Sequence, residues 1–286
     1  MIKDTDGDSY EEMRSLNQQL TFSYTDKELL DAGISFGETQ KRTLGIISDD
    51  GTYSNLGLLL SDQCVHTIKL AEFEGAVKTN FRDRHEFTGS LLKQMNEAYI
   101  LIDRFNRISS RTGGLKRVDE REYPPEAIRE ALANVIVHRD YGYSSSIQIS
   151  MFDDRIEMIS IGGLVKGITM DDIKLGVSIL RNEKLANVFY RLHLIEAYGT
   201  GIPKILESYR DYGLAPKLEP SDNAFKISLP NVQYPKQREL VTPADLSKNE
   251  ERVLAMLESS KSLTRKDVKD TLSISQTTAI TLLSKM

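Results

Sequence analysis

Cysteine and long apolar runs are nearly absent from this chain of 286 residues. Its one cysteine, Cys64, excludes an internal disulfide and a zinc site built on several thiolates, and its histidines lack the spacing of metal ligands. No apolar run approaches the roughly 18 residues of a membrane span, and residues 1–14 are too acidic for a signal peptide. These absences favour a cytoplasmic protein that does not enter a membrane.

Motifs of the commonest ATPases and hydrolases are also missing. The chain has no G-x-x-x-x-G-K-[ST] segment, which excludes a P-loop ATPase and a helicase motor of that kind. It has no G-x-S-x-G segment either, which excludes a nucleophile elbow. Internal repeats and low-complexity segments are lacking as well. A functional site therefore has to be sought in other groupings of residues.

Composition and charge describe an ordinary soluble protein with an uneven charge distribution. Hydrophobic residues make up 40% and charged residues 28%, and the length suggests about two domains. Residues 231–286 carry nine Lys/Arg and seven Asp/Glu, a net charge of +2. The whole chain has a net charge of −5, so residues 1–230 have a net charge of −7. An acidic body with a slightly basic end restricts any DNA binding to a local face.

Hydrophobic periodicity divides the chain into five parts. Residues 1–24 are polar without a clear period, and we interpret them as the end of a preceding domain. We expect a small α+β subdomain over 25–112, an α/β sandwich over 113–230, a linker over 231–246 and a helix–turn–helix over 247–286. Helices are predicted near 25–30, 88–105, 126–138, 182–192 and 201–213, and strands at 65–74, 146–152, 155–161 and 224–230. Thr25 and Glu28 have capping-box spacing, which places the first helix start at Thr25.

The strongest chemical signal is the pair Glu130 and Asn134 on the predicted helix 126–138. At a spacing of i and i+4, both side chains project from the same helical face, opposite the apolar stripe. An amide oxygen is a hard ligand of the kind that Mg²⁺ prefers, and a carboxylate can take a proton from an attacking water. The alternative is the solvated face of an amphipathic helix, which explains an isolated pair equally well.

Four segments in fixed order resemble a known family. They are EALANVIVHRDY (130–141), FDDRIEMISIGGL (152–164), LRNEKLA (180–186) and LIEAYGTGI (194–202). Together they resemble the RecG C-terminal-like ATP-binding domain, a divergent branch of the GHKL fold shared by histidine kinases, gyrase and MutL. The resemblance covers most of residues 25–230 and implies an α/β sandwich that binds ATP and Mg²⁺. It also implies a bacterial transcriptional regulator in which residues 1–24 are the remnant of a Schlafen-like Alba domain.

The resemblance assigns roles to individual residues. Glu130 becomes a candidate catalytic base, and Asn134 becomes the Mg²⁺ ligand and a nucleotide-binding residue. Gly162 and Gly163 match the middle glycines of the family. The turn that cradles the phosphates is matched by Gly199, Thr200 and Gly201.

Four further residues are candidates for the nucleotide site. Ser160 stands where the wider family has an Asp that reads the adenine amino group, and its neutral hydroxyl is a weaker acceptor than a carboxylate. Arg139 is a candidate phosphate ligand, or else a helix C-terminal residue that interacts favourably with the helix dipole. Arg181 and Asn182 are candidates for the nucleotide edge, or else cap the helix that follows them.

The C-terminal residues have the pattern of a helix–turn–helix that begins a winged helix. A helix at 265–272, a turn at 272–275 and a second helix from 276 match it. Candidate phosphate contacts are Arg265, Lys266 and Lys269, and candidate base contacts are Gln276, Thr277 and Thr278. The alternative is a small helical module for protein contact or dimerisation.

These patterns lead to one main hypothesis and two alternatives. We expect a DNA-binding transcriptional regulator with a divergent GHKL-type ATP-binding sensor domain, which uses ATP and Mg²⁺ and forms a homo-oligomer. One alternative is a slow Mg²⁺-dependent ATPase with Glu130 as its base. The other is a degenerate interaction scaffold without nucleotide, which the loss of the Asp at Ser160 favours and the retention of Glu130 and Asn134 disfavours.

Overall fold

The computed structural model describes residues 9–113, 116–196, 199–234 and 265–272 together with residues 253 and 275. The chain separates into two compact units, residues 1–234 and residues 235–286, and each unit is described by itself. The division at 234/235 falls inside the predicted linker 231–246, most of which lies outside the described residues.

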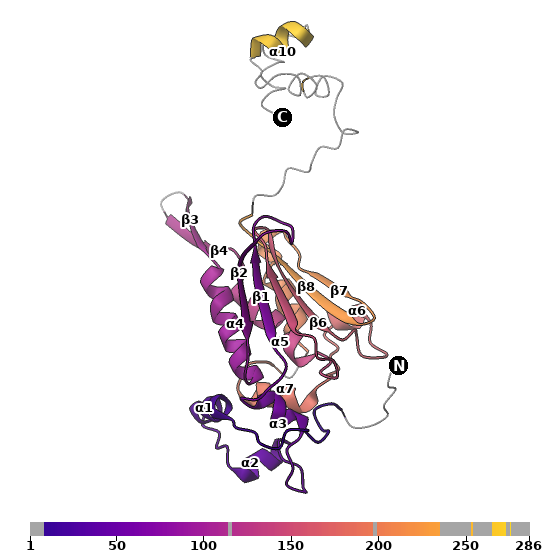
Figure 1. Ribbon diagram of the computed structural model, residues 1–286. Coiled ribbons are helices and arrows are strands. Elements are labelled where there is room, and N and C mark those ends of the chain that lie inside the picture. The colour runs from indigo at the N-terminus through magenta and orange to yellow at the C-terminus, as the bar shows by residue number, and fades with distance from the viewer. Residues whose placement is uncertain are drawn as a thin grey trace. The chain divides into compact units, whose positions relative to one another are not determined.

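A six-stranded mixed sheet forms the centre of the first unit (Figure 1). Its strands are β1 (Ile68–Phe73), β2 (Phe81–Phe87), β5 (Ile147–Met151), β6 (Arg155–Ile161), β7 (Lys217–Pro220) and β8 (Ala224–Pro230). They are ordered β2-β1-β5-β6-β8-β7; β1 and β5 run parallel, and the other neighbours are antiparallel. The mixed sheet with packed helices confirms the predicted α/β sandwich class.

Apolar side chains run across the strands on one face of the sheet and bury it. One row joins Leu70, Ile149, Met158 and Ile227, each at most 1% exposed. Successive side chains of a strand point to opposite faces, so the clean alternation in 146–152 and 155–161 that predicted these strands marks this buried face.

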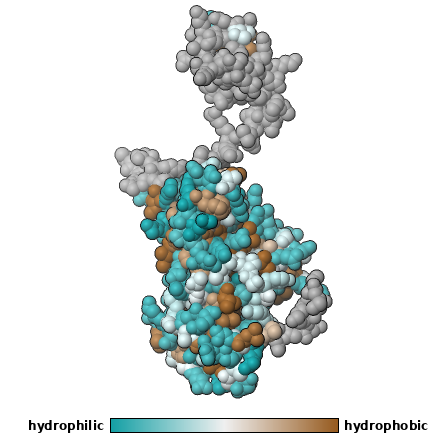
Figure 2. All heavy atoms as spheres, in the orientation of Figure 1, coloured by the Kyte–Doolittle hydropathy of each residue, from teal (hydrophilic) through white to brown (hydrophobic). Residues whose placement is uncertain are grey.

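The opposite face of the sheet is polar. Ion pairs join neighbouring strands there, Lys69 Nζ to Glu86 Oε1 at 3.6 Å and Lys226 Nζ to Glu219 Oε2 at 2.8 Å. Hydrophilic residues predominate on the visible surface of this unit, with apolar ones scattered among them (Figure 2). In the described part of the first unit, the helices with the most contacts to the sheet therefore pack on its apolar face.

Two helices cover the buried face of the sheet. They are α4 (Leu91–Phe105), capped by the Ser90 hydroxyl, and α5 (Pro125–Val137), which begins with proline at its first position. Helix α5 packs against α4, α8 (Gly201–Glu207), β6 and β8. Because neighbours surround it, α5 is buried on nearly all sides rather than on one stripe.

Helices α1 (Ser23–Asp31), α2 (Glu38–Thr43) and α3 (Asn55–Leu60) lie together at one end of the sheet (Figure 1). The predicted capping box is wrong, because α1 begins at Ser23 and Thr25 lies inside it. The buried Thr25 hydroxyl instead donates to the Leu60 carbonyl at 2.6 Å and joins α1 to α3.

The boundary predicted at residue 113 does not separate two folding units. Strand β1, from the predicted α+β subdomain, pairs in parallel with β5 of the predicted sandwich, with Ile68 opposite Ile147. Residues 9–24 belong to the same unit, since Leu20 and Phe22 are buried in its core. Pairing between distant segments has no local sequence pattern, so periodicity placed boundaries where the structure has none.

Several elements of the first unit had no prediction. Strand β2 and the hairpin of β3 (Ile108–Gly113) and β4 (Lys116–Arg121) read FRDRHEF, ISSRTG and KRVDER, without the apolar alternation that predicts a strand.

The predicted helix 201–213 is divided into α8 and the 3₁₀ turn η1 (Arg210–Tyr212), and Gly213 ends it with φ 62°. Helices α6 (Met170–Lys174) and α7 (Glu183–Arg191) complete the unit.

Helix α10 (Arg265–Leu272) is the element described in the second unit, and it coincides with the predicted helix 265–272. Val268 and Leu272 are buried, whereas Lys269 is exposed. The proposed recognition helix, with Gln276, Thr277 and Thr278, lies outside the described residues, as do the side chains of Arg265 and Lys266.

The N-terminus of α7 is capped from a segment distant in sequence. The buried Glu11 carboxylate accepts hydrogen bonds from the backbone N–H groups of Lys184 at 2.7 Å and Leu185 at 2.8 Å. Burial raises the pKa of Glu11, and these two bonds offset part of that rise. A carboxylate at a helix N-terminus satisfies free N–H groups and interacts favourably with the dipole.

We predict that Glu11→Ala lowers the free energy of unfolding by about 2 kcal/mol, because it leaves two buried N–H groups without acceptors. The adjacent Glu12 is a matched control, since its carboxylate is 40% exposed and contacts Lys184 Nζ at 2.9 Å and Ser9, without capping α7. Glu12→Ala should cost at most about 1 kcal/mol. Urea denaturation of the three proteins measures both values, and equal losses would contradict the capping role of Glu11.

Candidate functional site

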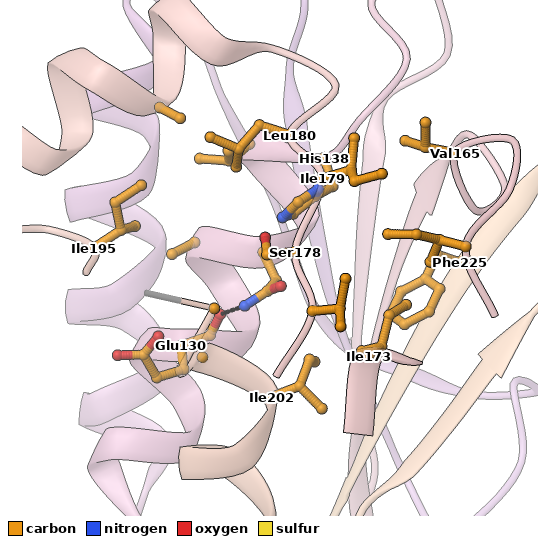
Figure 3. A pocket seen from close by; sticks show the side chains of 18 of the residues that line it. Glu130, His138, Val165, Ile173, Ser178, Ile179, Leu180, Ile195, Ile202 and Phe225 are labelled. Carbon is orange, nitrogen blue, oxygen red and sulfur yellow. Dashed lines mark hydrogen bonds between the residues drawn. The ribbon is translucent and has the colours of Figure 1, made fainter. Parts of the chain in front are cut away.

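A cavity of about 440 Å³ lies beside α5, the end of β6, the segment 164–180, α7 and the turn 199–201. Apolar side chains make up much of its wall, and Figure 3 shows Val165, Ile173, Ile179, Leu180, Ile195, Ile202 and Phe225 around it. The polar side chains on its wall come from α5 and the residue after it, from α7, and singly from Ser160, Ser178, Glu196 and Thr200. A largely apolar pocket with a few polar groups is the usual form of a small-molecule site.

Helix α5 presents three polar side chains to this cavity, Glu130, Asn134 and His138, which we call the α5 stripe. Their spacing of four residues places them along one helical face. The predicted common face of Glu130 and Asn134 is present, but Glu130 is only 4% exposed, so that face is not solvated. The Asn134 amide nitrogen donates to the Glu130 carbonyl at 2.8 Å, so its side-chain oxygen is not used in that bond.

The phosphate turn predicted at Gly199, Thr200 and Gly201 meets the α5 stripe. All three residues line the cavity. A Cβ at Gly201 would lie 3.0 Å from Asn134 Nδ2 and 3.1 Å from Glu130 Oε2, so the absent side chain leaves these polar atoms room. Gly199 has φ 66°, and a Cβ there would meet the Gly176 carbonyl oxygen at 2.1 Å, so the turn packs against the loop after α6.

The side chains near Gly201 include ligand types that suit a hard divalent cation, although the Asn134 atom nearest to Gly201 is its amide nitrogen. Asn134 offers an amide oxygen and Glu130 a carboxylate, and Mg²⁺ takes oxygen ligands and keeps several waters. No cluster of three or more His, Cys, Asp or Glu that could hold a metal occurs among the described residues. An ion here would therefore rely on one or two protein ligands together with oxygens of a bound substrate.

Glu130 is a carboxylate held in an unfavourable environment. Burial raises its pKa, and the positive charges of Arg129 and Lys204 only partly oppose that rise. Arg129 Nη2 donates to Glu130 Oε1 at 2.6 Å, whereas Oε2 faces Gly201. A carboxylate with a raised pKa is a better proton acceptor near neutral pH than an exposed one.

The end of β6 forms the floor of the cavity. Ser160 is 2% exposed and lines the cavity together with Gly162 and Gly163. Gly162 has φ 112°, and a Cβ at Gly163 would lie 2.5 Å from the Ser221 carbonyl oxygen. Glycine is required at both positions because the backbone turns sharply at one and touches the β7–β8 turn at the other.

Arg139, the predicted phosphate ligand, is not among the residues that line this cavity. Its side chain is fully buried, and Nη2 donates to the carbonyls of Tyr143, at 2.9 Å, and Ser145. The guanidinium also lies over the Tyr141 ring, 4.9 Å from its centroid. Arg139 follows the last turn of α5, where it faces away from the α5 stripe and supports the loop at 141–145.

Arg181 and Asn182 do not line the cavity either, and their role differs from both predictions. The Asn182 amide donates to the carbonyls of Val137 and Arg139, both at 2.7 Å. Arg181 Nε donates to the His138 carbonyl at 3.2 Å. These residues therefore cap the end of α5 rather than the start of α7, where Asn182 makes no side-chain cap bond.

The sequence did not identify several pocket residues, which come from the segment 164–180, from α7, from β8 and from His138. The segment supplies Ile168, Ile173 and Ile179. Burial, together with the nearby charge of Arg181, lowers the pKa of His138 to about 4, so its imidazole is neutral at neutral pH. The continued four-residue spacing from Glu130 and Asn134 was the signal for His138, whereas the segment 164–180 has no comparable pattern.

Basic side chains are missing from the wall of the cavity. Among the described residues that line it, no Lys or Arg occurs, whereas Glu130, Glu183 and Glu196 do. Lys204 lies close by but pairs with Glu196. An anionic ligand in this cavity would therefore require a cation bound with it.

The comparisons agree with the fold and with part of the resemblance. Residues 144–229 match the sequence model of the family described as "Putative ATP-dependent DNA helicase recG C-terminal". The crystal structure of the DIP2311 protein from Corynebacterium diphtheriae is similar with a TM-score of 0.68 and 21% identity, over 98% of this chain and 60% of that chain. A comparison with curated proteins gave no match. No helix in the described part of the chain is long and apolar enough to cross a membrane.

These matches bear on different parts of the site. The matched residues 144–229 include Ser160, the glycines after it and the turn 199–201, but not Glu130 and Asn134. The likeness to the solved structure concerns the fold alone, and this chain spans only 60% of that protein's length. The RecG C-terminal-like resemblance is therefore confirmed over residues 144–229, while the Alba-domain context and the winged helix stay predictions.

We predict that Glu130→Gln raises the melting temperature at pH 7 to 8. The raised pKa means that folding disfavours the charged carboxylate, so an uncharged isostere is more stable at pH values above that pKa. The difference should disappear as the pH falls through the raised pKa, because wild-type Glu130 then becomes neutral. Glu126→Gln, at a 52% exposed position on the same helix, should change little. Melting curves between pH 4 and 8 test this, and a destabilised Glu130→Gln protein at pH 8 would contradict it.

Proposed function

We propose that the first unit binds ATP with Mg²⁺ in the cavity beside α5, as the sensor domain of a DNA-binding transcriptional regulator. The observation that carries this proposal is the convergence of Glu130, Asn134 and Gly201 at one end of a mostly apolar cavity. The match of residues 144–229 to the RecG C-terminal-like family supports it.

The polar end of the cavity suits the charged part of the nucleotide. Asn134 and Glu130 would hold the ion, which neutralises phosphate charge and orients the phosphates. Glycines at 199 and 201 let backbone N–H groups approach an anion closely, as in other phosphate-binding turns. Because no Lys or Arg lines the cavity in the described part of the chain, we expect binding to depend strongly on the cation.

The apolar end of the cavity suits an aromatic base. Isoleucine, leucine and valine side chains from 164–180 surround it, and Phe225 contributes a ring (Figure 3). Apolar walls take the faces of a flat ring, and the few polar groups between them set its orientation.

A slow Mg²⁺-dependent ATPase is the second candidate function. The raised pKa of Glu130 favours it, because this carboxylate is suited to accept a proton from a water near the bound phosphates. Phosphoryl transfer depends mainly on positioning and charge stabilisation, and the wall of this cavity lacks the basic side chains that usually supply them. We therefore favour a sensor over an efficient enzyme.

We predict that calorimetry on the whole chain detects ATP binding that requires Mg²⁺. Asn134→Ala removes a metal ligand and should weaken binding roughly 10- to 100-fold. Gly201→Val should weaken it as much, because its side chain would fill the space next to Asn134 and Glu130. Asn96→Ala, at an exposed position on α4, is the matched control and should bind like the wild type.

Two outcomes would change this assignment. Absence of binding to ATP with Mg²⁺ at millimolar concentration would leave the interaction scaffold as the better function. Turnover at or above the ~10 per second that is typical of enzymes, lost in Glu130→Gln, would instead establish an ATPase.

The DNA part of the proposal rests on the second unit. Helix α10 buries Val268 and Leu272 and exposes Lys269, the arrangement of an amphipathic helix that packs on one side and can contact a phosphate on the other. The slight positive charge of residues 231–286, against an acidic remainder, supports a local DNA contact.

We predict salt-sensitive binding of the whole chain to a random-sequence DNA pool, measured by fluorescence anisotropy. In a plot of the logarithm of the binding constant against the logarithm of the salt concentration, Lys269→Ala should reduce the magnitude of the slope by about 0.9. This is the contribution of one phosphate contact. Lys217→Ala, an exposed lysine of β7 in the first unit, should leave the slope unchanged. Binding without salt dependence, or equal slopes for both variants, would make residues 247–286 a protein-contact module.

A further inference from the structure

The β3–β4 hairpin is a sheet of its own, apart from the six-stranded sheet of the first unit (Figure 1). Its ladder runs from Ile108 opposite Arg121 to Gly113 opposite Lys116. Residues directly opposite share a face of the ribbon and successive residues alternate between the faces, so each face has one large apolar residue in the ladder, Ile108 or Val118. A ribbon without an apolar row has nothing with which to pack on a core or on an apolar partner, and Ile108 is 57% exposed.

Positive charge is concentrated on the hairpin and on the residues that lead into it. Residues 103–121 carry six Lys/Arg and three Asp/Glu, a net charge of +3, whereas the other residues of 1–230 have a net charge of −10. Arg104, in the last turn of α4, and Arg107, just before β3, are exposed. The ladder itself contains the other basic residues, Arg111, Lys116, Arg117 and Arg121. A basic segment on an acidic unit attracts a polyanion to this place and not to the rest of the surface.

Buried residues fix the base of the hairpin. Asn106 is 3% exposed, and its side chain donates to the Tyr123 carbonyl at 2.8 Å and accepts from the Tyr123 N–H at 2.9 Å. The Val232 N–H donates to the Glu122 carbonyl at 2.8 Å. The base of the hairpin is therefore held beside residues 231–234, where the first unit ends.

The chain thus continues toward the second unit from the base of the hairpin. The predicted linker ends at residue 246, so even when fully extended from residue 234 it spans roughly 40 Å. This is the length of about 12 base pairs of B-DNA. A duplex bound by the second unit would be kept within reach of the hairpin by this linker.

We propose that the β3–β4 hairpin binds the phosphate backbone of duplex DNA and is a second DNA contact of this chain. This inference rests on the DNA part of the proposed function. The major groove of B-DNA admits a two-stranded ribbon, and Lys/Arg contacts with phosphates position a protein without reading the sequence. Arg121 already pairs with Asp103. The phosphate contacts are therefore assigned to the remaining basic residues, Arg104, Arg107, Arg111, Lys116 and Arg117.

Fluorescence anisotropy of the whole chain with a random-sequence pool of duplex DNA tests this inference. Arg107→Ala and Arg111→Ala, introduced together, remove two basic residues that are four positions apart and share one face of the ribbon. The logarithm of the binding constant is again plotted against the logarithm of the salt concentration. The magnitude of the slope should fall by about 1.8, because each phosphate contact contributes about 0.9.

Lys27→Ala together with Lys217→Ala is the matched control. Both lysines are exposed, on α1 and on β7, and their removal changes the charge of the first unit by the same amount. The slope of this control should equal that of the wild type, and melting curves would show that every variant is folded.

Three outcomes would overturn this inference. If the hairpin variant has the slope of the control while Lys269→Ala still lowers it, the hairpin is not a DNA contact and the DNA part of the proposed function stands. Absence of salt-sensitive binding by the wild type would overturn both. Binding of a pool of RNA duplexes at least about 10-fold more tightly than DNA would overturn the assignment of the hairpin to DNA.

Discussion

The buried end of α5 is the constraint on which the site depends. A helix that ends inside a protein must find hydrogen-bond donors for its last carbonyls among the protein's own groups. Here Asn182 and Arg181 donate to the three carbonyls at that end, so the start of α7 is fixed against the end of α5. This joint sets the direction of the α5 stripe and the position of one cavity wall. The Asn182 amide is directed at the end of α5 and makes no cap bond to its own helix, and Glu11 supplies the cap of α7.

The charges around the cavity describe a site that is incomplete by itself. A carboxylate with a raised pKa, an amide oxygen and two further glutamates line it, without a basic side chain among the described lining residues. Arg129 and Lys204 pair with two of these carboxylates without lining the cavity, and a further cation would neutralise the remaining negative charge. A cation held by so few protein ligands is weakly bound unless an anion shares it. Ion and nucleotide would therefore each increase the affinity of the other, which is a coupling free energy between two ligands.

Sequence patterns predicted the parts of this fold that have a local period, together with the site residues that lie on them. Strands β5, β6 and β8 and helices α4, α5 and α7 were placed to within a few residues, and Glu130, Asn134, Ser160 and the glycines do line one cavity. The sequence did not predict that the side chains of Arg139, Arg181 and Asn182 donate to backbone carbonyls instead of lining the cavity. A basic or amide side chain near a helix end can contact either a ligand or a carbonyl, and the local sequence is the same in both cases. The joining of residues 25–112 to the sandwich depends on the pairing of β1 with β5, and no local pattern encodes that pairing.

The Glu11 cap has a consequence for how the polypeptide acquires its structure during synthesis. Glu11 leaves the ribosome early, but its acceptor role is fulfilled only after Lys184 and Leu185 have been made. Strand β1 likewise waits for β5, whose residues follow it by nearly 80 positions. Until Lys184 and Leu185 are made, the Glu11 carboxylate has no N–H groups to accept from, and until residue 224 the sheet lacks β8, which pairs with β6. The nascent chain should therefore rely on chaperones for most of its translation, and truncated products that stop before residue 185 should be removed by proteases.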